Sequence, residues 1–168
     1  MGELTRKQVI SIVKEADGGT PNLAGRDLSG LDLTGVYLRG ADFNGANLVG
    51  ANLSGEDLTT NPQTESAAKF VRANLTGANL SKANLAGVNL AGADLSGANL
   101  AGANLADANL TPEGKDAVKL RGANLREANF AGANLTGADL TGADLTGANF
   151  EDAVLYKAEM KDVKGYAG

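Results

Sequence analysis

The side chains that most often carry out chemistry in proteins are scarce in this sequence. Its 168 residues include no His and no Cys, so the commonest general base, the thiolate nucleophile and most zinc ligands are missing. Serine and threonine are plentiful, but a hydroxyl nucleophile needs a neighbouring base to activate it. Carboxylate pairs such as Asp139 and Asp144 are the remaining candidates for acid–base chemistry, and the fold decides whether they can meet.

A large apolar residue recurs at every fifth position along most of the chain. Leu, Phe or Met occupies all of these positions in three runs, 23–58, 70–110 and 120–160. A small residue, nearly always Ala, stands two positions earlier, and Asn or Asp usually separates the two. Residues two apart lie on the same side of an extended chain, so both point toward a core. An α-helix does not suit this period, because five residues advance about 500° around its axis.

The other two positions of each unit favour a change of chain direction. Ser, Thr or Ala commonly follows the large residue, and Gly commonly ends the unit. Gly, Asn and Asp tolerate the conformations that a turn requires. We therefore predict a chain that turns a corner every five residues around a narrow core. The predicted core includes Leu28, Leu33, Leu48, Leu75, Leu95 and Leu135.

Units such as 93–97 (Ala-Asp-Leu-Ser-Gly) and 143–147 (Ala-Asp-Leu-Thr-Gly) resemble those of the pentapeptide repeat family. The resemblance extends over about residues 21–162. It implies an all-β solenoid, specifically a right-handed quadrilateral β-helix with four units per coil, and a bacterial source, with cyanobacteria favoured. Four sides per coil would place Asp139 and Asp144 on adjacent sides, pointing in different directions. We therefore expect no enzymatic activity, no metal and no cofactor.

The N-terminus departs from the repeat, and residues 1–19 are predicted to form a short capping helix. Thr5 and Gln8 have the spacing of a capping box. Val9 and Ile12 belong to one apolar stripe on the helix. Such a helix would cover the open end of the solenoid, because an uncovered coil exposes unpaired backbone groups and Leu side chains.

Two interruptions divide the β-helix that is predicted for residues 20–162, at about 59–69 and 111–119. Large residues are 12 positions apart across the first and 10 apart across the second. The first is an insert, and the second is either an insert or a substituted side of the coil. Inserts in a solenoid often mark its binding surface, although a tolerated loop is the alternative. The predicted interaction surface comprises Glu65, Lys69, Arg72, Lys115, Lys119, Arg121 and Arg126.

The repeat also weakens toward the C-terminus. Val154 and Glu159 replace the outward Asn or Asp, and Tyr156 stands where Ser or Thr is usual. Residues 163–168 are predicted to form a tail. This end is interpreted either as a second lid or as a homodimer contact through the C-terminal end. Some pentapeptide repeat proteins that resemble this one dimerise through their C-terminal coils.

The function predicted from these features is a non-enzymatic scaffold for protein–protein interaction, with an unknown protein partner. The alternative, implied by the resemblance, is a DNA mimic that binds a type II topoisomerase such as gyrase. DNA carries one charge per about 1.7 Å, so a rod of about 31 Å would need about 18 well-placed acids to imitate it. The chain has 20 acidic and 15 basic residues and a net charge of −5, which disfavours mimicry.

The same charge balance argues against direct nucleic-acid binding, which would need a basic stripe. No apolar run approaches the roughly 20 residues of a membrane span. The charged start of the sequence is followed by no apolar segment of the kind found in signal peptides. We therefore expect a cytoplasmic protein that does not contact a membrane.

Overall fold

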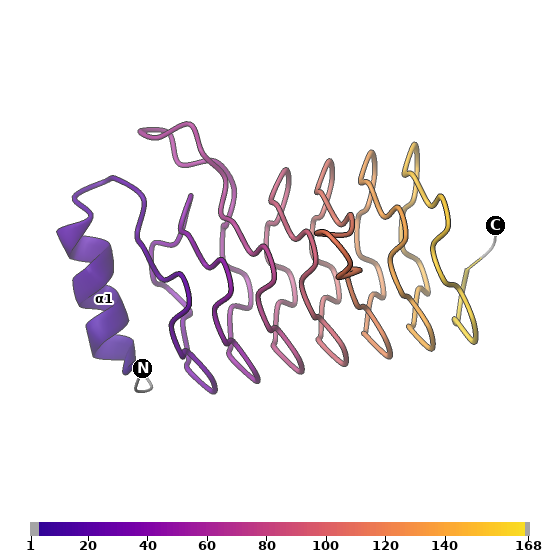
Figure 1. Cartoon of the computed structure of the whole chain (residues 1–168), viewed down its shortest axis with the longest axis horizontal. Helices are drawn as coiled ribbons and strands as arrows, with labels where there is room; N and C mark the ends of the chain where they lie inside the picture. The colour runs from indigo at the N-terminus through magenta and orange to yellow at the C-terminus, as the bar shows by residue number, and fades with distance from the viewer. Residues whose placement is uncertain (1–3, 167–168) are drawn as a thin grey trace.

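The computed structural model describes residues 4–166, which form one helix and a stack of coils (Figure 1). Helix α1 (Arg6–Glu15) begins with the predicted capping box. The hydroxyl of Thr5 accepts the N–H of Gln8, and the Gln8 side chain accepts the N–H of Thr5. Val9 is fully buried, and α1 lies across the N-terminal end of the stack.

Parallel β-bridges of single residues join successive coils, and the described residues contain no longer strand. Within uninterrupted stretches the bridged residues are 20 apart, as in Asn22–Asp42 and Asn74–Asp94. Twenty residues make four repeats, so each coil has four sides, as predicted. We name the sides by their bridged residues: side 1 carries Asn22, Asp42 and Lys69; side 2 carries Asp27, Asn47 and Asn74; side 3 carries Asp32, Asn52 and Asn79; side 4 carries Asp57, Asn84 and Asn104.

The repeat at residues 74–78 illustrates how all five backbone N–H groups of a unit find acceptors. Two of them donate to the following coil, one donates to the preceding coil, one closes the turn, and one donates to a side chain. The bonds are Leu75 to Asp94 O (2.7 Å), Gly77 to Ser96 O (3.0 Å), Asn74 to Ala46 O (2.9 Å), Ala78 to Leu75 O (2.9 Å) and Thr76 to Asn74 Oδ1 (3.1 Å). Unsatisfied buried backbone groups are costly, so this complete pairing stabilises the short repeat.

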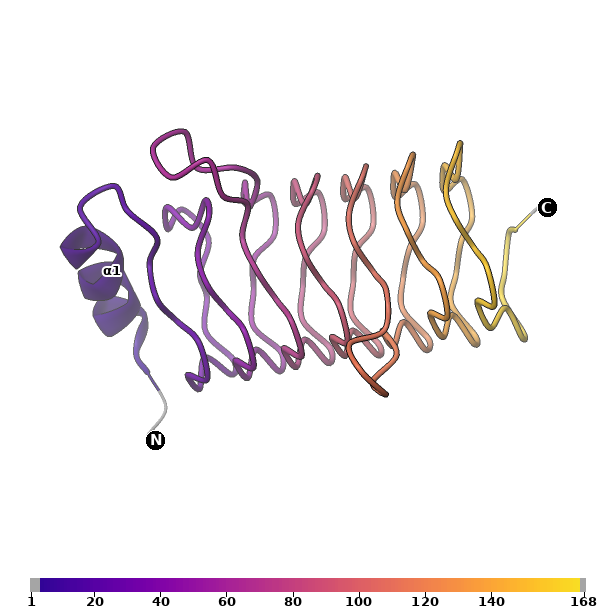
Figure 2. The ribbon, with the colours of Figure 1, turned by 45° about the horizontal axis from the view of Figure 1, so that its top comes forward.

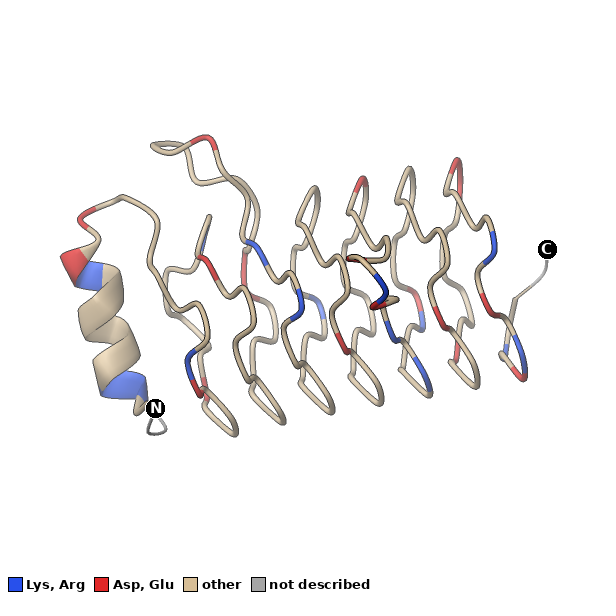
Figure 3. Cartoon of the chain, viewed as in Figure 1, with Lys and Arg blue, Asp and Glu red and all other residues tan. Residues whose placement is uncertain are grey.

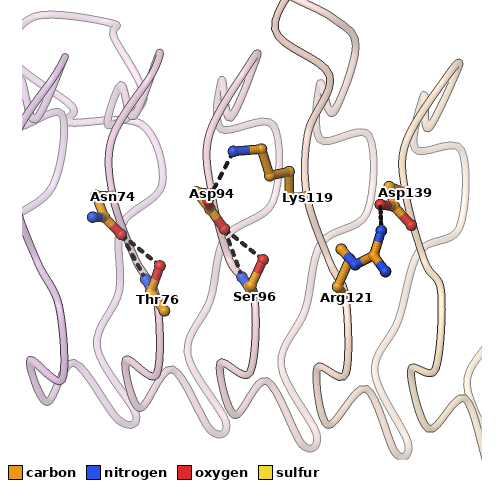
Figure 4. A network of polar contacts seen from close by, with 7 residues as sticks. All are labelled: Asn74, Thr76, Asp94, Ser96, Lys119, Arg121 and Asp139. Carbon is orange, nitrogen blue, oxygen red and sulfur yellow. Dashed lines mark hydrogen bonds and ion pairs between the residues drawn. The ribbon is translucent and has the colours of Figure 1, made fainter.

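The bond to the side chain gives the physical reason for Asn or Asp at the outward position. Their Oδ1 accepts the N–H two residues later, at the corner of the coil. Figure 4 shows this bond from Thr76 to Asn74 and from Ser96 to Asp94. Such Asx turns are a well-known preference of these two residue types.

The large and small residues of each unit fill the core, as predicted. All six predicted core leucines have no exposed surface. Phe43 and Phe70 stack inside at 4.7 Å between ring centroids. Burial becomes partial in the last coil, at Phe150, Leu155 and Met160.

Both interruptions are inserts. Bridged residues are 27 apart across the first (Asp57–Asn84) and 25 apart across the second (Asn109–Asn134). Relative to the coil of 20 residues, the first adds 27 − 20 = 7 residues and the second adds 25 − 20 = 5. The alternative of a substituted side is therefore wrong for the second interruption.

The two inserts leave the coil at different corners (Figure 2). The first lies between sides 4 and 1, and the second lies between sides 1 and 2. Each contains a small antiparallel bridge, Asn61–Ser66 in the first and Glu113–Asp116 in the second.

The coil ladder continues to Lys164, which bridges Asp144, two residues beyond the predicted end of the β-helix. Within residues 4–166, no helix is long and apolar enough to span a membrane.

Candidate functional site

The first insert is bound to the N-terminal part of the chain. Asn61 is fully buried, and its Nδ2 donates to the carbonyls of Gly18 and Gly19, both at 3.2 Å. The insert folds back over Gly40 in the preceding coil, where Ser66 O and Asn61 Cβ would lie 2.7 and 2.8 Å from an added Cβ. The side-chain amide of Asn61 therefore binds other parts of the same chain.

The second insert also folds back over a glycine, but most of its surface is free. Residues 112–116 are all exposed. The Cβ of Glu113 packs over Gly92 in the preceding coil. Arg72 holds the insert from one coil further back, with its Nε 3.4 Å from Asp116 Oδ2 and an NH2 donating to Glu113 O at 3.4 Å.

Side 2 beside this insert carries two further ion pairs (Figure 4). Lys119 Nζ lies 3.0 Å from Asp94 Oδ2, and an NH1 of Arg121 lies 3.0 Å from Asp139 Oδ2. Burial alone would raise the pKa of Asp94, but hydrogen bonds from Ser96 and Lys119 outweigh burial and lower the pKa. The carboxylate is therefore charged at neutral pH. Such partly exposed pairs contribute little to stability, so their main effect is to orient the side chains.

Four of the seven residues predicted for the interaction surface belong to the second insert or to the ion pairs beside it: Lys115 lies in the insert, and Arg72, Lys119 and Arg121 form the ion pairs. The other three lie elsewhere. Glu65 belongs to the first insert, Lys69 lies on side 1, and Arg126 pairs with Asp144 on side 3 at 3.4 Å. The sequence reasoning did not single out Asp94, Asp116 and Asp139 as ion-pair partners, or Asn61 as a buried tether.

Sides 3 and 4 carry rows of asparagine besides one ion pair each, Arg126–Asp144 on side 3 and Arg39–Asp57 on side 4. On side 3 the Nδ2 of each Asn donates to the residue one coil earlier, in a row that runs from Asn124 to Asp32. A second row runs along side 4 from Asn149 to Asn84. These asparagine ladders present repeated amides, whereas acidic and basic residues of both signs occur along the rod as a whole (Figure 3).

The carboxylates of Asp139 and Asp144 do not form a pair. Asp139 bridges Lys119 on side 2 and Asp144 bridges Asn124 on side 3, so the two carboxylates lie on adjacent sides. Each is paired with an arginine, Arg121 or Arg126. Among residues 4–166 no group of three or more acidic side chains is placed to hold a metal ion. What the geometry offers is a fixed, charged surface on a rod.

A rod of stacked four-sided coils with an apolar interior defines a β-solenoid repeat protein. The family model described as pentapeptide repeats matches the chain in 8 copies, over residues 22–55, 73–111, 116–152 and 133–164. The chain therefore belongs to the pentapeptide repeat family.

Several solved structures are similar to the chain. HetL, a pentapeptide repeat protein involved in heterocyst differentiation regulation in the cyanobacterium Nostoc sp. strain PCC 7120, is 24% identical, with 94% of this chain and 98% of that chain covered and a TM-score of 0.37. QnrB1, a plasmid-mediated fluoroquinolone resistance protein, is 18% identical over 85% of this chain and 88% of that chain, with a TM-score of 0.43. A pentapeptide repeat protein of the Arabidopsis thaliana thylakoid lumen is 32% identical over 77% of this chain and 72% of that chain, with a TM-score of 0.24. No curated protein sequence matches.

Proposed function

We propose that the chain is a non-enzymatic scaffold that binds a protein partner through its second-insert surface. This surface consists of residues 112–116 together with Arg72, Lys119 and Arg121. The observation that carries the proposal is the exposed insert, held in place by Arg72 beside oriented charges of both signs. Arginines in fixed positions are frequent anchors of protein interfaces.

The contrast between the two inserts supports this assignment. The first insert uses Asn61 to bind the linker after α1, which fits a structural role. The second insert leaves residues 112–116 exposed and open to a partner. Along the asparagine rows of sides 3 and 4 the outward side chains are short amides, and the arginines of these sides, Arg39 and Arg126, stand at the corners.

Replacing residues 112–117 by a single Gly restores the unbroken repeat and tests the proposal. The coil should persist by circular dichroism, with a loss of no more than about 1 kcal/mol of unfolding free energy, because the lost ion pair is exposed. Partners that the wild type captures from cells of its source should be lost. The matched control replaces residues 60–67 by a single Gly, which should weaken the contact with α1 but keep the partners.

Retention of the partners by the variant without the second insert would show that binding lies elsewhere. A DNA-supercoiling assay with gyrase tests the alternative function, a DNA mimic. Stoichiometric inhibition by the wild type would favour that alternative. The charges disfavour that outcome, because Asp57, Asp94, Asp116, Asp139 and Asp144 are paired with basic side chains. Paired acids resemble a phosphate backbone poorly.

The proposal includes right-handed winding of the coils and a capping role for α1. Contacts at the first coil support the cap. The N–H of Leu4 donates to Asp27 O at 2.8 Å. Arg6 donates through Nε to Asp32 O at 2.8 Å and through NH2 to Thr34 O at 2.6 Å. In later coils the equivalent carbonyls accept backbone N–H groups of the preceding coil. At the first coil the Arg6 guanidinium donates to these carbonyls instead.

Arg6→Ala should therefore lower the unfolding free energy by about 1–2 kcal/mol, because two backbone carbonyls lose charge-assisted bonds. Amide hydrogen exchange should rise in the first coil. Lys7→Ala is the control, since no contact of Lys7 with the coil is found among the described residues, and its effect should stay within about 0.5 kcal/mol. Equal losses in the two variants would argue against the cap.

A homodimer through the C-terminal end stays a prediction of the sequence. Light scattering of the purified chain tests it directly.

A further inference from the structure

The ladder that joins successive coils is broken at one internal place, on side 4 between the first coil (residues 22–40) and the second (residues 42–59). Tyr37 and Asp57 stand at the outward positions that face each other there, yet no bridge joins them. In the part of the chain that the structure describes, every other facing pair of outward residues in successive coils is bridged. Because α1 covers the first coil, the break lies inside the molecule and not at an end of the stack.

Two backbone hydrogen bonds of the regular pattern are missing at this break. On side 3 of the same two coils, Leu33 donates to Asn52 O at 2.9 Å and Asn52 donates back to Leu31 O at 2.8 Å. The equivalent donors on side 4 are the N–H groups of Leu38 and Asp57, and neither finds an acceptor within residues 4–166. Unpaired backbone groups are costly, so a specific feature of the sequence must maintain the break.

Glu56 is that feature. It occupies the inward position that is normally small, and the later coils carry Ala83, Ala103 and Ala128 at this position of side 4. The Glu56 side chain turns toward the first coil, where its Oε1 accepts the N–H of Gly35 at 2.6 Å. Corner glycines in the other coils donate to a backbone carbonyl of the following coil. The carboxylate therefore takes the place of the backbone acceptor at this corner.

Two other irregularities nearby do not explain the break. Tyr37 lacks the usual amide or carboxylate at the outward position, but so do Lys69 and Val154, which are bridged. An insert follows the second coil directly, but Asn109 also precedes an insert and is bridged to the coil before it. The long side chain of Glu56 is the difference that remains.

A pair of charged side chains joins the two coils across the break. Arg39 donates through Nε to Asp57 Oδ2 at 2.8 Å and through an NH2 to the same oxygen. Burial alone would raise the pKa of Asp57, but hydrogen bonds from Arg39 and Thr59 outweigh burial and lower the pKa, so the carboxylate is charged at neutral pH. The two side chains are 32% and 39% exposed, and ion pairs exposed to this extent are weak.

We propose that residues 36–39 form a strap that opens while the rest of the solenoid stays folded, with the Arg39–Asp57 ion pair as its latch. Gly40, the corner that follows the strap, keeps its bond to Thr59 O at 3.2 Å. A segment with few backbone bonds opens at a lower free energy than the surrounding ladder. Opening uncovers the buried side chains of Val36 and Leu38. This strap is a movable part of the rod that is separate from the second-insert surface.

Amide hydrogen exchange of the 168-residue chain, followed by NMR, tests the proposal. The reporters are the N–H groups of Val36 and Gly40, which bond Leu33 O and Thr59 O. Their protection factors should be at least about tenfold lower than those of Leu31 and Gly30. Leu31 and Gly30 make the equivalent bonds on other sides of the same coil, to Leu28 O and Val49 O.

Glu56→Ala restores the repeat consensus and should close the break. The N–H groups of Leu38 and Asp57 can then join the ladder, and their protection factors should rise at least about tenfold. Val36 and Gly40 should become as protected as their comparison amides. Glu56→Gln is the matched control, because it keeps the length of the side chain and an acceptor for the Gly35 N–H, so its exchange should resemble that of the wild type.

Arg39→Ala removes the latch and should lower the protection of Val36 and Gly40 by about two- to fivefold. Arg126→Ala is the matched control. Arg126 pairs with Asp144 from the same position of the repeat, but there the ladder is intact, with Leu125 donating to Asp144 O at 2.9 Å. Its removal should leave the protection of the neighbouring ladder amides unchanged.

Equal protection of the strap amides and of Leu31 and Gly30 in the wild type would overturn the strap. Unchanged exchange of Leu38 and Asp57 in Glu56→Ala would show that Glu56 does not maintain the break. Equal effects of the Arg39 and Arg126 variants on their neighbouring amides would rule out the latch. None of these outcomes bears on partner capture by the second-insert surface, which lies at another corner of the rod.

Discussion

Leu95→Lys will unfold the protein or lower its unfolding free energy by about 5 kcal/mol or more, because it places an unpaired charge in an apolar core. Leu95 has no exposed surface, and its N–H bonds Lys119 O at 2.7 Å in the middle of the stack. The long Lys side chain cannot reach solvent without displacing the coil above or below. Urea unfolding followed by circular dichroism measures the loss.

Asn99→Lys is the control for the register of the core. Asn99 lies outward, four residues later, and its amide bonds Asn79 and Asn124 in the side 3 ladder. Losing these partly exposed bonds should cost only about 1–2 kcal/mol. Similar losses for the two variants would contradict the inward position of Leu95.

Gly40→Ala should destabilise the protein by about 2–3 kcal/mol more than Gly55→Ala. Both glycines occupy coil corners with φ 69°, so both substitutions bring the same backbone strain. An added Cβ at Gly40 would lie 2.7 Å from Ser66 O, a backbone atom of the first insert. At Gly55 nothing lies within 4 Å of it.

The Gly40 variant should also release the first insert from the coil. Hydrogen exchange at Asn61 and in α1 should therefore rise in Gly40→Ala and stay unchanged in Gly55→Ala. Equal stability and exchange in the two variants would falsify the docking of the first insert over Gly40.

Much of the fold was predictable because the repeat is local. The inward position of Leu95 and the outward position of Asn99 follow from a period of five and from the alternation of an extended chain. The four-sided coil came from the family resemblance, and bridges between residues 20 apart confirm it. The start of α1 was predictable from Thr5 and Gln8, since a capping box is decided within four residues.

The candidate site was only partly predictable, because its contacts join different coils. Lys119 pairs with Asp94 on side 2 because the segment before it is an insert; if that segment formed a side of the coil, Lys119 would lie on side 3. The sequence alone left open whether that segment was an insert or a substituted side. By contrast, the placement of Arg121 and Arg126 on adjacent sides follows from their separation of one repeat.

The sequence by itself determined which residues of each repeat point inward, where the chain turns and where the repeat is broken, because these depend on side-chain size and backbone preferences within five residues. Only the tertiary structure decided that Gly40 and Gly92 receive the inserts, whereas Gly45 and Gly97 remain open. All four glycines end a repeat unit and are followed by Ala in the sequence. The atoms that lie over Gly40 and Gly92 belong to the inserts and to other coils. Their separation from these glycines along the chain depends on the number of residues in each coil and in each insert.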